Sequence, residues 1–187
     1  MRVGKMRIGV IGPTNIQATS AAAGLDPDLC ARVAREAGKG LAERGYSLIV
    51  VPDRGVGLLA AEAYRAAGGR WLTGIVPASG TSGQVAASRC SEHSRLCHEI
   101  VNDLPWTEQH ERICQLADAL LCIGISCGTL SEIAWTKWVG NTPVVVIRSL
   151  ISGIPQEMEA ETDLRWVDEL ESVYPCLQAI TEETQQR

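Results

Sequence analysis

Residues 119–132 read ALLCIGISCGTLSE, and this stretch decides the fold. Its first five residues are apolar and predict a buried β-strand over 119–123. Gly124 ends the apolar run, and a helical pattern begins at Thr129 and continues to Val139. A strand that passes through a short glycine-containing loop into a helix is the repeating unit of an α/β protein.

The same order of elements occurs on both sides of this stretch. The apolar patterns predict strands over 6–11, 46–51, 71–76 and 143–147, and helices over 27–45, 58–67 and 106–116. Such alternation implies right-handed crossovers between parallel strands. We therefore expect a Rossmann-like α/β fold, with a doubly wound, mainly parallel sheet flanked by helices. Because neither a repeat nor a linker interrupts the pattern, we expect residues 1–187 to form a single domain.

Three segments are less regular. Residues 18–24 are small and suggest a flexible loop, and residues 78–104 hold a Gly/Ser-rich turn and suggest an irregular insertion. Near the C-terminus, Trp166, Leu170, Val173 and Tyr174 mark one face of a helix. Since proline disrupts a helix interior, we expect this helix to stop at Pro175, with an edge strand over 177–180.

Composition narrows the functional classes. The chain has 187 residues, of which 45% are hydrophobic and 21% charged, and its net charge is -5. The negative charge and the lack of a long basic run argue against nucleic-acid binding. No apolar stretch is long enough to predict a membrane span, and residues 1–5 lack a signal peptide's apolar segment. We interpret Cys30, Cys114 and Cys122 as reduced, buried thiols of a cytoplasmic protein.

The strand-to-helix loops locate the expected site, because all of them lie at one edge of a parallel sheet. The helix start after Gly124 offers free backbone N–H groups and the positive end of a helix dipole, which favour a phosphate group. We predict that three loops bind such a ligand through Gly12, Thr14, Asn15, Asp53, Arg54, Gly55, Gly57, Gly124, Ser126, Cys127, Gly128 and Thr129. Glu132 would face the same crevice as an acid, a base or an acceptor for a ribose hydroxyl. In the alternative interpretation, this is an ordinary helix N-cap with a solvated Glu132.

Cysteine and histidine residues in the insertion raise the question of a metal. If helical, Cys90, His93 and Cys97 would share one face, and thiolate and imidazole groups bind zinc. The spacing matches no recognised zinc motif and has no evident fourth ligand, so we predict no metal site. Arg89 and Arg95 offer an alternative role for this segment, which is contact with ligand phosphates.

Three further features each allow two interpretations. Cys127 lies near a helix start that favours a reactive thiolate, but no base is paired with it in the sequence. Trp135 and Trp138 suit a core or a dimer interface. Asp53 and Arg54 either contact a ribose and a phosphate or pair with each other.

Several segments of the sequence together resemble a known family. The segments 116–120, 128–134 and 140–145 are similar to the second half of the LOG-like, or lysine-decarboxylase-like, proteins. Residues 8–12, 55–59, 67–69 and 74–77 follow in the order of the family's first half, so the resemblance spans roughly residues 6–148. The family includes the LONELY GUY phosphoribohydrolases and the molybdenum-cofactor-carrier-like proteins.

The resemblance implies a Rossmann-like homodimer that binds a nucleotide. Gly128, Thr129 and Glu132 match the end of the family signature Pro-Gly-Gly-x-Gly-Thr-x-x-Glu, whereas Ile125 and Ser126 replace its middle glycines. Gln109 stands where the enzymes have an arginine, and Arg112 lies one turn further along the predicted helix. The resemblance therefore implies Glu132 and Arg112 as the candidate catalytic residues.

These observations leave three hypotheses. In the first, the protein binds a nucleoside 5'-monophosphate and hydrolyses its N-glycosidic bond without a cofactor of its own. In the second, it is a non-catalytic carrier or sensor of a nucleotide or a molybdopterin-type cofactor, which the replaced arginine favours. In the third, it is a structural or regulatory module with a vestigial crevice. In the first two, the partner is a small phosphate-bearing molecule.

Overall fold

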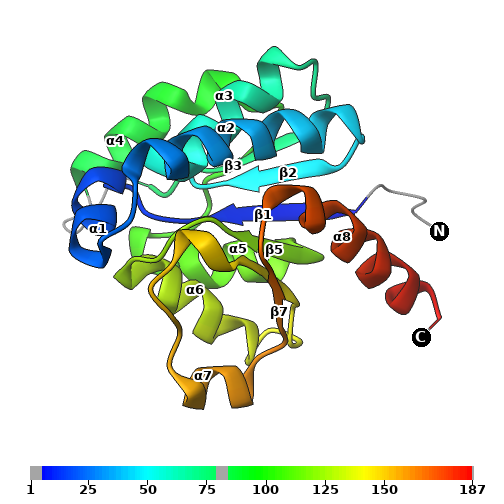
Figure 1. Ribbon diagram of the computed structural model, residues 1–187. Helices are drawn as coiled ribbons and strands as arrows, with labels where there is room; N and C mark the ends of the chain where they lie inside the picture. The colour runs from blue at the N-terminus through cyan, green and yellow to red at the C-terminus, as the bar shows by residue number, and fades with distance from the viewer. Residues whose placement is uncertain (1–5, 79–83, 187) are drawn as a thin grey trace.

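The computed structural model describes residues 6–78 and 84–186. A sheet of seven parallel strands runs through the molecule in the order β4-β3-β2-β1-β5-β6-β7 (Figure 1). The strands are β1 (Arg7–Ile11), β2 (Ser47–Val50), β3 (Leu72–Ile75), β4 (Glu99–Val101), β5 (Ala119–Cys122), β6 (Val144–Ile147) and β7 (Leu164–Val167).

The order of the strands confirms the predicted doubly wound architecture. From β1 the chain adds β2, β3 and β4 on one side, then returns to place β5, β6 and β7 on the other. The point of reversal lies between β1 and β5, where Ile8 is paired with Ala119 and Ile11 with Cys122. Loops diverge from this point at the carboxyl edge, where open α/β sheets bind their ligands.

Helices cover both faces of the sheet. They are α1 (Ile16–Ala23), α2 (Pro27–Glu43), α3 (Gly55–Ala66), α4 (Gln84–His93), α5 (Gln109–Leu116), α6 (Cys127–Thr136), α7 (Gln156–Glu161) and α8 (Leu170–Gln185). In Figure 1, α2 and α3 lie on one face, and α5 and α6 on the other. Each face holds its own hydrophobic core, and β1, β5 and β6 contribute buried residues to both. This double burial explains why these strands are almost continuously apolar.

The C-terminal prediction was wrong. Trp166 belongs to strand β7, and α8 begins at Leu170, continues through Pro175 and includes residues 177–180, which form no edge strand. Leu170, Val173, Leu177 and Ile180 are all buried, so they form one apolar face of the helix. Pro175 lies on the exposed side. Burial of that face offsets the hydrogen bond that the proline lacks.

The two other irregular segments also contain regular structure. Residues 16–23 form α1 instead of a loop, because Asn15 accepts a hydrogen bond from the backbone N–H of Ala18 at 3.2 Å and alanine favours helix. Within 78–104, α4 is followed by the short helix η1 (Ser94–Leu96) and by β4, which pairs with β3. The Gly/Ser-rich turn at 79–83 and residues 1–5 lie outside the described residues.

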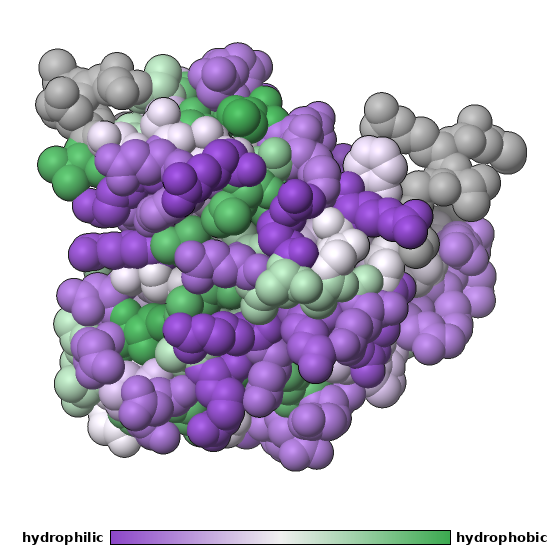
Figure 2. Space-filling model, turned by 90° about the horizontal axis from the view of Figure 1, so that it is seen from above, coloured by the Kyte–Doolittle hydropathy of each residue, from purple (hydrophilic) through white to green (hydrophobic). Residues whose placement is uncertain are grey.

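The face of the molecule that is seen from above is mostly hydrophilic. Seen from above, the molecule mixes many hydrophilic residues with small hydrophobic areas (Figure 2). No helix in the described part of the chain combines the length and the apolar character that a bilayer span requires.

Candidate functional site

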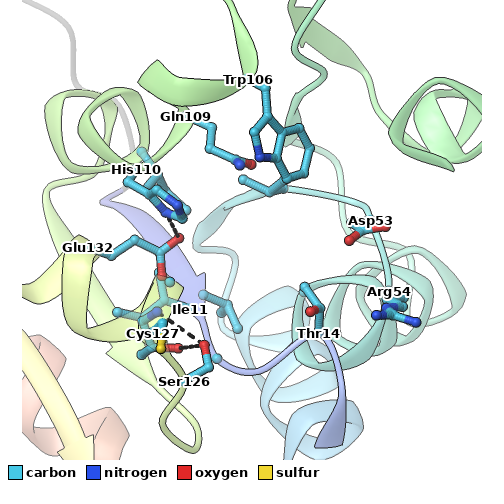
Figure 3. Close-up of a pocket in the computed structure, with 17 residues that line it drawn as sticks. Ile11, Thr14, Asp53, Arg54, Trp106, Gln109, His110, Ser126, Cys127 and Glu132 are labelled. Atoms are coloured by element: carbon cyan, nitrogen blue, oxygen red, sulfur yellow. Dashed lines mark hydrogen bonds and ion pairs between the residues drawn. The ribbon is translucent and has the colours of Figure 1, made fainter. Parts of the chain in front are cut away.

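A cavity of about 340 Å³ opens at the carboxyl edge of the sheet, beside the reversal point (Figure 3). Its walls come from the loops after β1, β2 and β5 and from α5 and α6. Most of the predicted ligand-binding residues line it together: Gly12, Thr14, Asp53, Arg54, Gly57, Ser126, Cys127, Gly128, Thr129 and Glu132. The volume lies within the range of small-molecule sites.

The start of α6 forms one wall. Ser126 is the N-cap, and its hydroxyl accepts a hydrogen bond from the backbone N–H of Thr129 at 3.2 Å. The backbone N–H groups of Cys127 and Gly128 belong to the first turn, so they have no acceptor within the helix. Both residues line the cavity at the positive end of the helix dipole, which suits an anion.

Glu132 and His110 face each other across α6 and α5. The Nδ1 atom of His110 lies 3.3 Å from a carboxylate oxygen of Glu132, which is only 7% exposed. Burial raises the pKa of Glu132 above its usual value, and the neighbouring imidazole opposes part of that rise. Glu132 is therefore a buried carboxyl group and not the solvated first-turn acid of the alternative interpretation.

Close packing holds this pair in place. The Sγ atom of Cys114 lies 3.0 Å from the backbone carbonyl oxygen of His110 and 3.2 Å from that of Glu132, and its single S–H group is shared between them, which links α5 to α6. A Cβ atom at Gly128 would lie 3.2 Å from the His110 ring. Glycine at this position therefore lets the imidazole approach the start of α6 closely.

The opposite wall holds a different pair. Asp53 is 3% exposed, and its carboxylate accepts a hydrogen bond from the guanidinium of Arg89 on α4. His93 reinforces the contact of α4 with this loop, because its Nδ1 atom donates to the carbonyl oxygen of Pro52 at 2.8 Å. Asp53 thus pairs with Arg89 and not with Arg54. Arg54 is exposed at the rim of the cavity and has no ion-pair partner among the described residues.

Helix α5 and the turn before it supply residues that sequence analysis missed. Trp106, His110 and Ile113 line the cavity together with Gln109, which was noted only as a replacement for arginine. The available signal was the spacing of 106, 109, 110 and 113, which places these residues on one side of consecutive helical turns. Without the orientation of α5, that spacing did not point to the cavity.

Four predicted residues lie outside the cavity lining. Asn15 caps α1, and Arg112 lies 3.5 Å from the carboxylate of Asp103. Gly55 starts α3 with a positive φ of 62°, and a Cβ atom there would clash with the carbonyl oxygen of Pro13. Gly124 also has a positive φ and lines a second hollow, on the side of α1. Both positions need glycine because their backbone has a positive φ, which other residues rarely adopt.

Cys90, His93 and Cys97 do not share one helix face. Cys90 is buried in α4, and that helix ends at His93, before Cys97. Within residues 6–78 and 84–186, no three His, Cys, Asp or Glu side chains are grouped so that they could hold a metal ion. Cys30, Cys114 and Cys122 are free and buried, as predicted, and burial raises the pKa of Cys30 to about 11.

A doubly wound parallel sheet with a ligand-sized cavity at its reversal point defines a Rossmann-type protein. Within that class, the chain belongs to the SLOG cluster4 family, whose sequence model matches residues 5–174. The predicted resemblance to LOG-like and molybdenum-cofactor-carrier-like proteins is confirmed.

Solved structures show the same fold. The Moco carrier protein of Chlamydomonas reinhardtii is 19% identical, with 96% of this chain and 99% of that chain covered and a TM-score of 0.71. The molybdenum cofactor binding protein of Rippkaea orientalis is 22% identical, with coverages of 96% and 99% and a TM-score of 0.70. The single-stranded-DNA-binding DNA processing protein A of Helicobacter pylori is 11% identical, with coverages of 94% and 81% and a TM-score of 0.62. A comparison with functionally curated proteins finds no match.

Proposed function

We propose that this protein binds a small phosphate-bearing ligand, a nucleotide or a molybdopterin-type cofactor, and holds it as a carrier or sensor without turnover. The observation that carries the proposal is the first turn of α6. Cys127 and Gly128 line a cavity at the reversal point of the sheet, and the free N–H groups of this helix start suit a phosphate group.

The charges around the cavity support the same ligand. The chain has a net charge of -5, so a phosphate group needs local attraction. Arg54 at the rim and the dipole of α6 supply it. The carboxylate of Asp53 is paired with Arg89, and the raised pKa of Glu132 reduces its negative charge. Both carboxyl groups therefore repel an anion less than exposed carboxylates would.

Two observations favour binding of the ligand without turnover over hydrolysis of an N-glycosidic bond. Gln109 occupies the position of the enzymes' arginine, and a neutral amide offers no fixed positive charge to a developing negative one. The two molybdenum-cofactor-binding proteins match this chain over nearly their full length.

The test is calorimetric titration with AMP, adenosine and inorganic phosphate, using the variant Cys127→Asp. Asp suits the first turn of a helix, so this variant should fold, but its carboxylate would repel a phosphate group. We expect AMP to bind more tightly than adenosine, and Cys127→Asp to weaken AMP binding at least about tenfold. Ser131→Asp, one turn further along the exposed face of α6, is the matched control. If no phosphate-bearing probe binds, the crevice is vestigial and the proposal fails.

The His110–Glu132 pair favours hydrolysis of a nucleoside 5'-monophosphate as a second candidate function. Glu132 would stabilise the positive charge that develops at the anomeric carbon, water would attack that carbon, and His110 would donate the proton that the leaving base needs. Free base released from AMP by the wild type, and lost in Glu132→Gln, would establish this reaction. Binding of AMP without release of base excludes it.

We also propose that the protein is a cytoplasmic homodimer. Trp135 and Trp138 are 38% and 72% exposed on the outer face of α6, and a second copy of this face would bury them. Free buried cysteines suit a reducing compartment. Sedimentation of the wild type and of Trp138→Glu tests the dimer, because a buried carboxylate would separate the two copies.

A further inference from the structure

The side chain of Gln109 is the feature of the cavity that the proposed phosphate site leaves unexplained. Gln109 is only 3% exposed, and its amide forms no hydrogen bond with another described residue. No buried polar side-chain atom in the described part of the chain is both sealed from solvent and unpartnered. The amide of Gln109 must therefore reach the open volume of the cavity.

The surroundings of this amide are aromatic and apolar. Figure 3 shows Gln109 and the indole of Trp106 on the side of the cavity away from Ser126 and Cys127. Ile113, one turn along α5 from Gln109, adds an apolar side chain to the lining. Such a surface packs against a flat, uncharged ring. The two ends of the cavity thus have different chemistry, since one suits an anion and the other suits an aromatic ring.

We propose that Gln109 and Trp106 determine ligand specificity by recognising a heteroaromatic ring with a hydrogen-bond donor and an acceptor on neighbouring atoms of one edge. This inference rests on the proposed phosphate site, which anchors the other end of the same ligand. A glutamine side chain carries one donor group and one acceptor side by side, so it forms two hydrogen bonds with such an edge. Aminopurines and rings with a lactam group carry this edge.

The alternative for Gln109 is a space-filling role at the base of α5. In that case its amide would contribute nothing to the choice of ligand. The two roles differ in one measurable respect. Only recognition makes the effect of a substitution at Gln109 depend on which polar groups the ligand carries.

The experiment measures affinities for ribose 5-phosphate, AMP, IMP and purine riboside 5'-monophosphate, which has the purine ring without the exocyclic donor. For the wild type, we expect AMP or IMP to bind more tightly than purine riboside 5'-monophosphate, and ribose 5-phosphate to bind most weakly. Gln109→Met preserves the approximate volume and removes both polar groups. It should reduce the preference for the better of AMP and IMP over purine riboside 5'-monophosphate by about tenfold or more.

Two further variants complete the design. Gln115→Met changes an exposed glutamine of the same helix and should preserve the wild-type preference. Trp106→Leu should reduce the affinity for all ring-bearing ligands relative to ribose 5-phosphate. If ribose 5-phosphate binds and Gln109→Met keeps the wild-type preference, this inference is wrong while the proposed phosphate site stands. If none of the four probes binds the wild type, the proposed function itself fails.

Discussion

Two carboxyl groups lie in opposite walls of one cavity, and their partners differ. Asp53 and Glu132 are both less than a tenth exposed. Asp53 pairs with a guanidinium, which keeps its charge at every pH that a protein survives, whereas Glu132 faces a histidine ring and burial raises the pKa of its carboxyl group. The wall of Asp53 is therefore held by a permanent ion pair. The wall of Glu132 can gain or lose a proton when pH or a ligand changes.

The largest expected effect comes from breaking the permanent pair with Arg89→Met. The substitution leaves the buried carboxylate of Asp53 without its partner and loosens the contact of α4 with the loop after β2. We expect a loss of about 2–3 kcal/mol in the free energy of unfolding, at the lower end for a buried pair because Arg89 is partly exposed. Denaturant unfolding at neutral pH measures it.

The double variant Arg89→Met/Asp53→Asn provides the control. Because the asparagine amide carries no charge, this variant should recover at least half of the stability that Arg89→Met loses. Equal stability of the single and double variants would mean that the Asp53–Arg89 pair does not hold this wall.

Ser126→Ala tests how the other wall is held, with a smaller expected effect. The substitution removes the hydroxyl that accepts the N–H of Thr129, so the first turn of α6 loses its cap. We expect a loss of about 1 kcal/mol in stability and a weaker affinity for AMP. Ser131→Ala, on the exposed face of the same helix, should change both quantities much less. Similar losses in the two variants would contradict the assigned cap.

The fold could largely be predicted from sequence because its signals are local. The apolar runs that form β1, β5 and β6 and the cap of α2 by Asp26 and Pro27 are each visible within a few residues. The C-terminal prediction failed because Pro175 is a strong local signal, whereas the burial of one face of α8 depends on the distant core.

The residues of the candidate site also differ in whether local sequence or tertiary packing sets their position. Ser126, Gly128 and Glu132 follow a recognisable strand–loop–helix order, so sequence analysis brought them together. His110 and Trp106 required the orientation of α5 relative to α6, which tertiary packing sets. The sequence suggests Arg89 only as a contact for ligand phosphates, because no local rule joins residues 53 and 89. Arg112 is one turn from Gln109, yet the helix directs it toward Asp103.

The smallest predicted effect is a gain in the free energy of unfolding for Glu132→Gln, whereas the variants above lose stability. The raised pKa of Glu132 means that its carboxyl group holds a proton more tightly in the folded chain than in the unfolded chain. This contribution to stability is fully present at pH values below the usual pKa of a glutamate, and it is lost as the pH rises through the raised value. Glu132→Gln carries no such dependence. It should therefore be slightly more stable than the wild type at neutral pH, and the difference should disappear in acid.

Unfolding curves of wild type and Glu132→Gln between acidic and neutral pH measure this difference, and Asp53→Asn supplies the contrast. Removing the carboxylate of Asp53 leaves Arg89 without its partner, so Asp53→Asn should lower stability at neutral pH where Glu132→Gln raises it. His110 opposes the rise in the pKa of Glu132, so this pKa should be higher still in the variant His110→Asn. The variant should therefore lose stability over a wider pH range than the wild type does. If Glu132→Gln instead loses stability at neutral pH as Asp53→Asn does, then His110 acts as a charged partner of Glu132, and the two walls are held by the same kind of interaction.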